Sequence, residues 1–214
     1  MRTVWYRRDI AKRFRSSLKD ERDVHCRLMQ AYTEVPDWWY ALIALVSLIM
    51  GIIAIEIFPT HMPIWGFFFG LLFAAIFSIP VGMIQAITNR NFQTNILAEL
   101  IAGYVFPNKP IANMIFKALG AIGVVQAITF SGDLKLGHYL KIPPRVMFTA
   151  QITATTISCV VVLCVQNWMF ANIPDVCTPH QPHGFICAST RTFGGASLVW
   201  GGIGPKRLFS AGAL

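Results

Sequence analysis

Three long apolar runs dominate the chain, and each is long enough to cross a lipid bilayer as a helix. The runs are residues 38–58, 64–88 and 146–171. The first run contains a single charged residue, Glu56, and the other two contain none. A membrane-spanning helix needs about 20 predominantly apolar residues. The pattern therefore predicts three spanning helices and an all-α membrane protein built as a helix bundle.

Residues 89–132 follow a different pattern, which predicts two shorter helical arms with a break between them. The apolar part of the first arm, 94–106, corresponds to about 20 Å of helix, which is too short to cross. The second arm, 111–131, corresponds to about 32 Å and carries Lys117 within it. Two topologies are compatible with this pattern. The arms form a broken, re-entrant hairpin over 94–131, or the second arm alone crosses the membrane.

The distribution of cations favours the hairpin. Nine of the 18 Lys and Arg residues precede Pro36, so we expect residues 1–37 to form a basic cytoplasmic segment. The transmembrane domain would then comprise residues 38–214. A single crossing by the second arm would move the three cations of 133–145 outside and expose loop 172–191 to the cytosol. The hairpin keeps those cations inside and leaves the two cysteines of the loop in an oxidising compartment.

The composition of the chain mainly excludes other classes of protein. Apolar residues make up 55% of the chain and charged residues only 13%, about half the usual share. These values exclude an ordinary soluble enzyme and a disordered chain. The net charge of +8 is better explained by a membrane-facing cytoplasmic segment than by nucleic-acid binding. The chain contains no nucleotide-binding loop, and no catalytic triad can be placed on one side of the membrane. We therefore expect no enzymatic activity and no cofactor.

Polar residues on the two arms are the candidates for a substrate or proton pathway. Asn91, Asn95 and Glu99 are spaced by four residues and share one helix face. Asn113 and Lys117 have the same spacing on the second arm. Polar residues on broken helices at membrane depth are typical of transporter binding sites. The simpler alternative is a structural Glu99–Lys117 ion pair that fastens the hairpin.

Two further segments stand out for opposite reasons. Gln85 follows Pro80 and Gly82 in the second apolar run, so the inner half of that helix is expected to pack closely or to line a polar cavity. The glycine-rich stretch 192–214 does not complete an apolar span. We expect it to begin a further element of the bundle.

Cys177 and Cys187 are the candidates for a disulfide in the polar loop 172–191. With His180 and His183 they follow the spacing C-x2-H-x2-H-x3-C, which is compatible with a zinc site. An oxidising compartment favours bridging between nearby thiols. The sequence therefore predicts a disulfide and no metal.

Several short sequence segments resemble those of a known family. They span most of the sequence in a fixed order: Glu34-Val35-Pro36-Asp37-Trp38-Trp39-Tyr40, Ile79-Pro80-Val81-Gly82, Pro110-Ile111-Ala112-Asn113-Met114, Lys141-Ile142-Pro143-Pro144-Arg145, and Ile203-Gly204-Pro205-Lys206-Arg207. On these residues the chain resembles the oligopeptide transporter (OPT) family of small-oligopeptide proton symporters.

The resemblance implies a multi-pass carrier of the plasma membrane that imports short peptides or related small solutes with protons. It also implies that this chain is part of a longer carrier, whose remaining helices and lipid bilayer are its partners. Two other functions stay open at this point. In the first, the chain is a membrane scaffold or non-functional fragment that does not transport. In the second, it is a membrane enzyme that uses the Cys/His loop.

Overall fold

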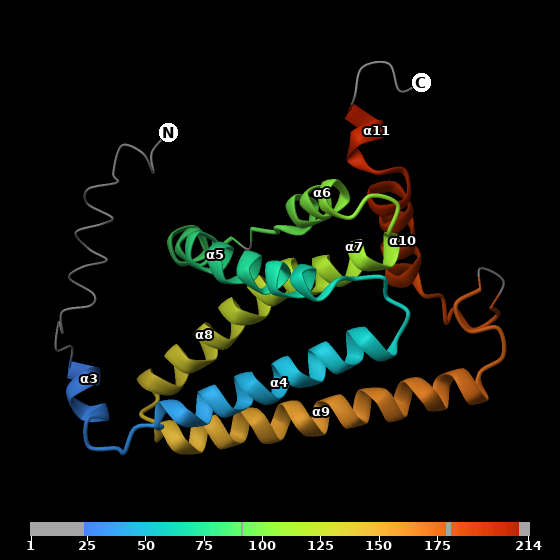
Figure 1. The fold of residues 1–214 in the computed structure, drawn as a ribbon. Helices are drawn as coiled ribbons and strands as arrows, with labels where there is room; N and C mark the ends of the chain where they lie inside the picture. Colours follow the sequence, from blue (N-terminus) through green and yellow to red (C-terminus); the bar gives the residue numbers. More distant parts are fainter. Residues whose placement is uncertain (1–23, 91, 179–180, 210–214) are drawn as a thin grey trace.

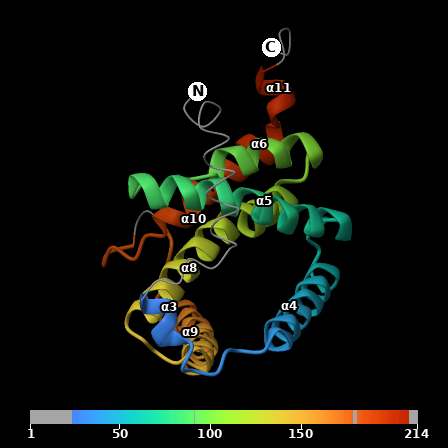
Figure 2. The same ribbon diagram turned by 90° about the vertical axis from the view of Figure 1, so that its left-hand side faces the viewer.

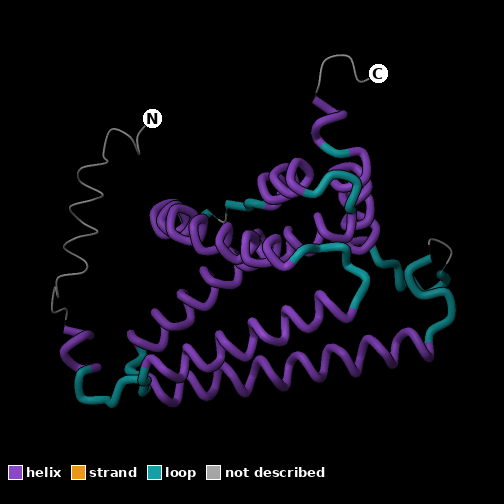
Figure 3. Tube along the Cα trace, in the orientation of Figure 1, coloured by secondary structure: helices purple, strands orange, loops and turns teal. Residues whose placement is uncertain are grey.

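Helices make up the regular structure of the chain in the computed structural model, which describes residues 24–90, 92–178 and 181–209. No strand occurs within these ranges (Figure 3). Asn91 and His180 lie outside the described residues. The all-α prediction is confirmed. The elements, in chain order, are α3 (Val24–Met29), α4 (Asp37–Ile57), α5 (Ile64–Thr88), α6 (Asn95–Val105), α7 (Pro110–Lys117), the π-helix η1 (Ala118–Ile122), α8 (Gly123–Tyr139), α9 (Pro144–Asn172), α10 (Ala188–Ala196), the π-helix η2 (Ser197–Ile203) and α11 (Pro205–Phe209).

Four helical stretches are long and apolar enough to cross a membrane. Three of them, α4, α5 and α9, lie at the three apolar runs. The fourth is the continuous stretch Pro110–Tyr139, which comprises α7, η1 and α8. This second arm extends past residue 131, where the apolar pattern ends. The polar residues that follow still favour a helix, and hydropathy alone does not report where a helix continues beyond the hydrocarbon.

The helices form two layers (Figure 1). One layer contains α4 and α9, and the other contains α5 to α8 with the C-terminal elements. Figure 2 shows α4 and α9 separated from each other over much of their length. Their contact includes Phe148 of α9, whose ring packs at 5.4 Å from Trp39 and 4.9 Å from Tyr40, centroid to centroid. No residue of α4 is buried, and Phe148 alone is buried in α9. Both helices therefore present apolar side chains outward, as helices in a lipid or multi-helix environment do.

The starts of α4 and α9 lie at the same end of the molecule as α3 and the end of α8 (Figure 1). The Arg145 Nε atom donates a hydrogen bond to the Glu34 carbonyl oxygen at 3.2 Å. The His25 ring packs edge-on against Tyr139 at 5.1 Å between centroids. The path from α4 through α5 and the two arms therefore returns to the end from which it began.

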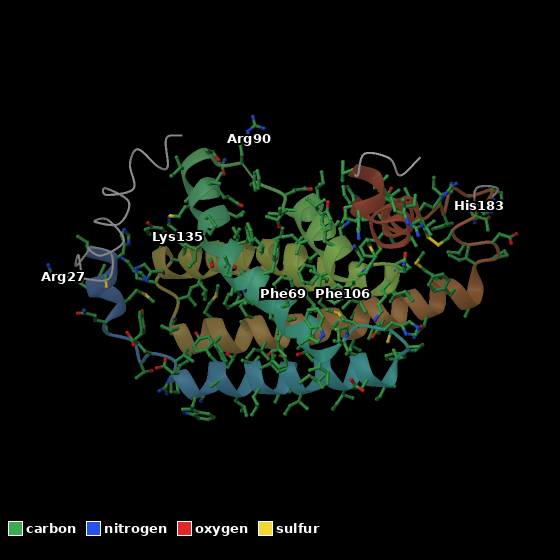
Figure 4. All side chains as sticks on the ribbon, turned by 45° about the horizontal axis from the view of Figure 1, so that its top comes forward. Arg27, Phe69, Arg90, Phe106, Lys135 and His183 are labelled. Carbon is green, nitrogen blue, oxygen red and sulfur yellow. A yellow bond between two sulfur atoms is a disulfide. The ribbon has the colours of Figure 1, made fainter. Side chains whose placement is uncertain are left out.

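The apolar core lies where α5, α6, α7 and η1 meet. Phe116 of α7 is fully buried, and its ring lies 5.4 Å from Phe69, 5.7 Å from Phe73 and 6.1 Å from Phe106, centroid to centroid. Figure 4 labels Phe69 and Phe106, which both pack against Phe116 at this crossing. Small side chains let the helices approach closely around the rings: Ala98, Ala102, Ala112 and Ala121 are fully buried. This packing fixes the two arms against α5 and positions the polar side chains that they carry.

Candidate functional site

The helical hairpin consists of α6 and α7, which pack against each other and are joined by residues 106–109. The Pro-flanked connector ends one arm and begins the next. Pro107 closely follows the last residue of α6, and a helix rarely continues into the residue before a proline. Pro110 occupies the first turn of α7, where its missing N–H group has no intrahelical partner to lose. Asn108 takes the left-handed backbone conformation (φ 59°) that completes the turn.

Glu99 and Lys117 form an ion pair between the two arms. The Lys117 Nζ atom lies 2.5 Å from the Glu99 Oε1 atom. The Glu99 side chain is 5% exposed and that of Lys117 is 14% exposed, so water has little access to either charge. A buried carboxylate without a partner is strongly unfavourable, and the ammonium group supplies that partner.

Asn113 connects the same two arms next to the ion pair. Its Nδ2 atom donates to the backbone carbonyl oxygen of Glu99 at 3.2 Å, and the residue is fully buried. Within the described residues, neither the Asn113 Oδ1 atom nor the buried Thr94 Oγ1 atom has a hydrogen-bond partner. Buried polar atoms are normally paired. These two atoms therefore offer hydrogen-bonding capacity to a water molecule or a solute that enters the site.

Lys117 also contacts the C-terminal part of the chain. Its Nζ atom lies 5.0 Å from the centroid of the Phe193 ring on α10, within the range of a cation–π interaction. The π-helix η1 begins at the next residue, Ala118. Short π-helical segments within α-helices occur frequently at functional sites. Lys117 thus lies at a junction of an ion pair, an aromatic face and an irregular helical turn.

The glycine-rich segment closes over the hairpin, a role that sequence reasoning missed. A Cβ atom added at Gly201 of η2 would lie 2.5 Å from the Pro110 Cα atom. A Cβ atom added at Gly103 of α6 would collide with Pro205 and with the Trp200 carbonyl oxygen. Only glycine permits these backbone approaches. The run of glycines was the available signal, but it did not indicate which helices the segment contacts.

The structure brings together three of the six pathway candidates. Glu99, Asn113 and Lys117 form one cluster. Asn95 is half-buried and its Nδ2 atom donates to Gln93 Oε1 at 3.1 Å, so its amide bonds locally. Gln85 lines a separate cleft between α5 and α8. Asn91 lies outside the described residues.

Cys177 and Cys187 form a disulfide in the loop between α9 and α10. A disulfide leaves neither sulfur as the thiolate that zinc binds, so this pairing is incompatible with the alternative zinc site. The backbone N–H groups of His183 and Phe185 donate to Gln181 Oε1 at 2.8 and 3.0 Å, which holds the turn of the loop. The other described cysteines, Cys26, Cys159 and Cys164, are free.

Comparison with known sequences identifies the family. The family described as OPT oligopeptide transporter protein matches residues 1–214. The chain belongs to this family. Its members are transporters by description, and no enzyme is implied. The four apolar helical stretches accordingly make this chain part of a multi-pass integral membrane protein.

Relatives of this OPT chain occur in plants and yeasts. Oligopeptide transporter 7 from Arabidopsis thaliana is 44% identical over 209 residues, 96% of this chain and 27% of the relative. Oligopeptide transporter 1 from Saccharomyces cerevisiae is 41% identical over 212 residues, 99% of this chain and 26% of the relative. Glutathione transporter 1 from Schizosaccharomyces pombe is 42% identical over 206 residues, 96% of this chain and 24% of the relative. The chain thus spans about a quarter of the length of these relatives. No solved structure matches it.

Proposed function

We propose that this chain contributes to a proton-coupled carrier that imports short peptides or related small solutes, and that the Glu99–Lys117 pair participates in proton coupling. The observation that carries the proposal is the buried ion pair between the two arms of a broken hairpin. Charged residues at membrane depth are energetically unfavourable and are typical of ion and proton pathways. The names of the relatives support peptides as the substrate class.

The proposed mechanism uses the change of environment at Glu99. With the arms closed, the buried Glu99 carboxylate has the Lys117 ammonium at 2.5 Å as its partner. A small separation of the arms would remove this partner, and a proton would then take its place on Glu99. Closure of the arms would restore the ion pair and favour release. The uncommitted Asn113 Oδ1 and Thr94 Oγ1 atoms would accept a hydrogen bond from water or solute while the arms are apart.

The proposed topology places residues 1–37 in the cytoplasm, α4, α5 and α9 across the plasma membrane, and loop 172–191 outside. In this topology the first arm of the hairpin begins on the cytoplasmic side and the second arm ends there. The hydrogen bond from Arg145 to the Glu34 carbonyl supports it, because α4 and α9 then begin on the same side. The disulfide in loop 172–191 supports an oxidising location for that loop.

A membrane scaffold without transport is the alternative from another class. A scaffold would need no buried, partly unpaired polar groups at the centre of a hairpin, and Asn113 with its partner-free oxygen favours the carrier. A membrane enzyme would need a nucleophile and base in the Cys/His loop, and the disulfide removes both loop cysteines from that role.

The test uses a hybrid carrier, in which the complete 214-residue chain replaces the matched segment of Oligopeptide transporter 1 from Saccharomyces cerevisiae. Uptake of a labelled short peptide is measured in proteoliposomes with and without an inward proton gradient. We expect accumulation that depends on the gradient and is abolished by a protonophore. Equal peptide uptake with and without the proton gradient would contradict proton coupling. A folded hybrid carrier without peptide uptake, beside an active host, would favour the scaffold.

A further inference from the structure

A second polar site lies between α5 and α8, separate from the Glu99–Lys117 pair. It is a cleft of about 580 Å³, within the range of about 300–1,000 Å³ that is usual for small-molecule sites. Figure 4 shows Lys135 on α8 near the last turns of α5, where the cleft lies. Its lining residues come from these two helices and from the residue that ends α5: Ser78, Gly82, Gln85, Ala86, Asn89, Ala127, Ile128, Ser131, Gly132 and Lys135.

The cleft offers hydrogen-bond donors that the fold does not use. The Gln85 side chain is half-buried and the Asn89 side chain is exposed, and neither amide takes part in a hydrogen bond with another described residue. The two serines are already engaged, because Ser78 donates to the Ala74 carbonyl and Ser131 donates to the Ala127 carbonyl. The two carboxamides are therefore the neutral donors that a ligand in the cleft would meet.

Lys135 gives the cleft its charge. It is the one charged residue in the lining, and no carboxylate of the described residues lines the cleft. Its ammonium lies 5.9 Å from the centroid of the Tyr139 ring and forms no ion pair with a carboxylate of the described residues. The nearby Asp133 carboxylate accepts a hydrogen bond from Gln151 Nε2 at 3.3 Å on α9. One cation and two neutral amide donors, with no anion from the described residues in the lining, are suited to a carboxylate.

Two glycines keep the cleft open. A Cβ atom at Gly82 would have Ile128 Cγ1 as its nearest neighbour at 3.9 Å, and a Cβ atom at Gly132 would meet no atom within 4 Å. The fold does not require glycine at position 132 for close packing. A larger side chain there would enter the cleft without disturbing the backbone.

We propose that this cleft binds the carboxylate end of the transported peptide, with Lys135 forming the ion pair and Gln85 and Asn89 donating hydrogen bonds. The inference rests on the proposed function, because it takes a peptide as the substrate. It assigns the recognition of the peptide terminus to the α5–α8 cleft and leaves proton coupling to the hairpin. Substrate and proton would then act at separate sites, which are linked by the contacts of α5 with α7, η1 and α8.

The test compares a tripeptide with its C-terminal amide as competitors for a labelled peptide bound to the hybrid carrier in phosphatidylcholine nanodiscs. We expect the free acid to bind about tenfold more tightly than the amide, as a charge-assisted contact would produce. Lys135→Gln should reduce that ratio to about one, and Lys135→Arg should largely retain it. Lys141→Gln removes a cation outside the cleft and serves as the charge control. An unchanged ratio in Lys135→Gln, with peptide still bound, would overturn the inference.

A second variant tests the cleft by its volume. Gly132→Leu should weaken the binding of both peptides by about tenfold by filling the cleft, without loss of folded protein. Gly194→Leu is the matched control, because a Cβ atom at Gly194 on α10 also meets no atom within 4 Å. Equal binding by the two variants would overturn the inference.

Two results separate a lipid site from a failure of the carrier itself. A dependence on added phosphatidylglycerol that Lys135→Gln removes, with no change in the acid-to-amide ratio, would identify a lipid site and overturn the inference. Absence of any peptide binding by the unmodified hybrid carrier, beside an active host, would overturn the proposed function.

Discussion

At the scale of the residue, local competition decides which polar side chains join the site. Asn95 and Glu99 share a helix face, yet the Asn95 amide bonds to Gln93 two residues away. Asn side chains near a helix start often find such nearby partners. Glu99 has no comparable local partner among the described residues and pairs across the hairpin with Lys117. Helix spacing identified the shared faces, but it could not rank local against long-range bonds.

The residues that sequence reasoning missed lack a periodic signal. Thr94 is 1% exposed at the start of α6, although a polar residue at that position usually remains accessible. Phe193 reaches Lys117 from a segment far away in the sequence. Gly201 and Gly103 are required by contacts between helices that no single-helix pattern contains. Such contacts depend on how the elements assemble.

Gly201 allows a test of the close approach between η2 and α7. In Gly201→Ala the new Cβ atom would lie 2.5 Å from Pro110 Cα and 3.2 Å from Asn113 Cβ. We expect the substitution to lower the free energy of unfolding by about 1–3 kcal/mol, as overpacking against backbone typically does. The temperature at which the hybrid carrier stops being monodisperse in detergent measures the effect. Gly202→Ala is the control, because its Cβ atom would meet nothing within 4 Å. Equal stability of the two variants would argue against close packing at Gly201.

At the scale of the element, the sequence predicted the presence of the helices better than the residues at which they end. Long apolar runs need a fully hydrogen-bonded backbone in lipid, so α4, α5 and α9 follow directly from hydropathy. The Pro-flanked connector likewise separates α6 from α7. The second arm continues to Tyr139, beyond its apolar part, because polar residues can extend a helix into water. No sequence pattern predicted that α7 would continue as the π-helix η1.

The loop between α9 and α10 should carry a disulfide in the cellular protein. Closing a loop of about 11 residues by Cys177 and Cys187 should contribute roughly 3 kcal/mol through chain entropy. A single non-reduced peptide containing both cysteines is the expected mass-spectrometric result. The Cys177→Ser/Cys187→Ser double variant should lower thermal stability, and Cys159→Ser/Cys164→Ser, which removes two free cysteines, should not. Free thiols at both loop positions in surface-exposed protein would contradict the bridge and its external location.

At the scale of the whole molecule, the two layers bury their surfaces unequally. The hairpin layer has a core, whereas α4 and α9 bury almost none of their apolar side chains. The chain spans about a quarter of its relatives' length. We therefore expect further helices or lipid to cover α4 and α9. The sequence could not distinguish these environments, because both favour the same apolar side chains.

The proposed topology predicts that Glu34 and Lys141 lie on the same side of the membrane and Thr60 on the other. Single cysteines are introduced at each position in the hybrid carrier, in a background without free cysteines, and labelled with an impermeant maleimide. We expect Thr60→Cys to react in intact cells, and Glu34→Cys and Lys141→Cys to react only after permeabilisation. Labelling of Glu34→Cys and Lys141→Cys from opposite sides would instead mean that the second arm crosses alone.

The most direct test of proton coupling is the effect of Glu99→Gln on two modes of transport by the hybrid carrier. The glutamine keeps the shape of the side chain and removes its titration, so a role in coupling separates from a role in binding. In proteoliposomes we predict that the variant loses gradient-driven peptide accumulation and retains peptide exchange at equal pH on both sides. If Glu99 only fastens the hairpin, both modes will fall together with the amount of folded protein, and a Glu99→Lys/Lys117→Glu charge swap will restore them. Normal gradient-driven accumulation by Glu99→Gln would contradict the central claim and remove Glu99 from the mechanism.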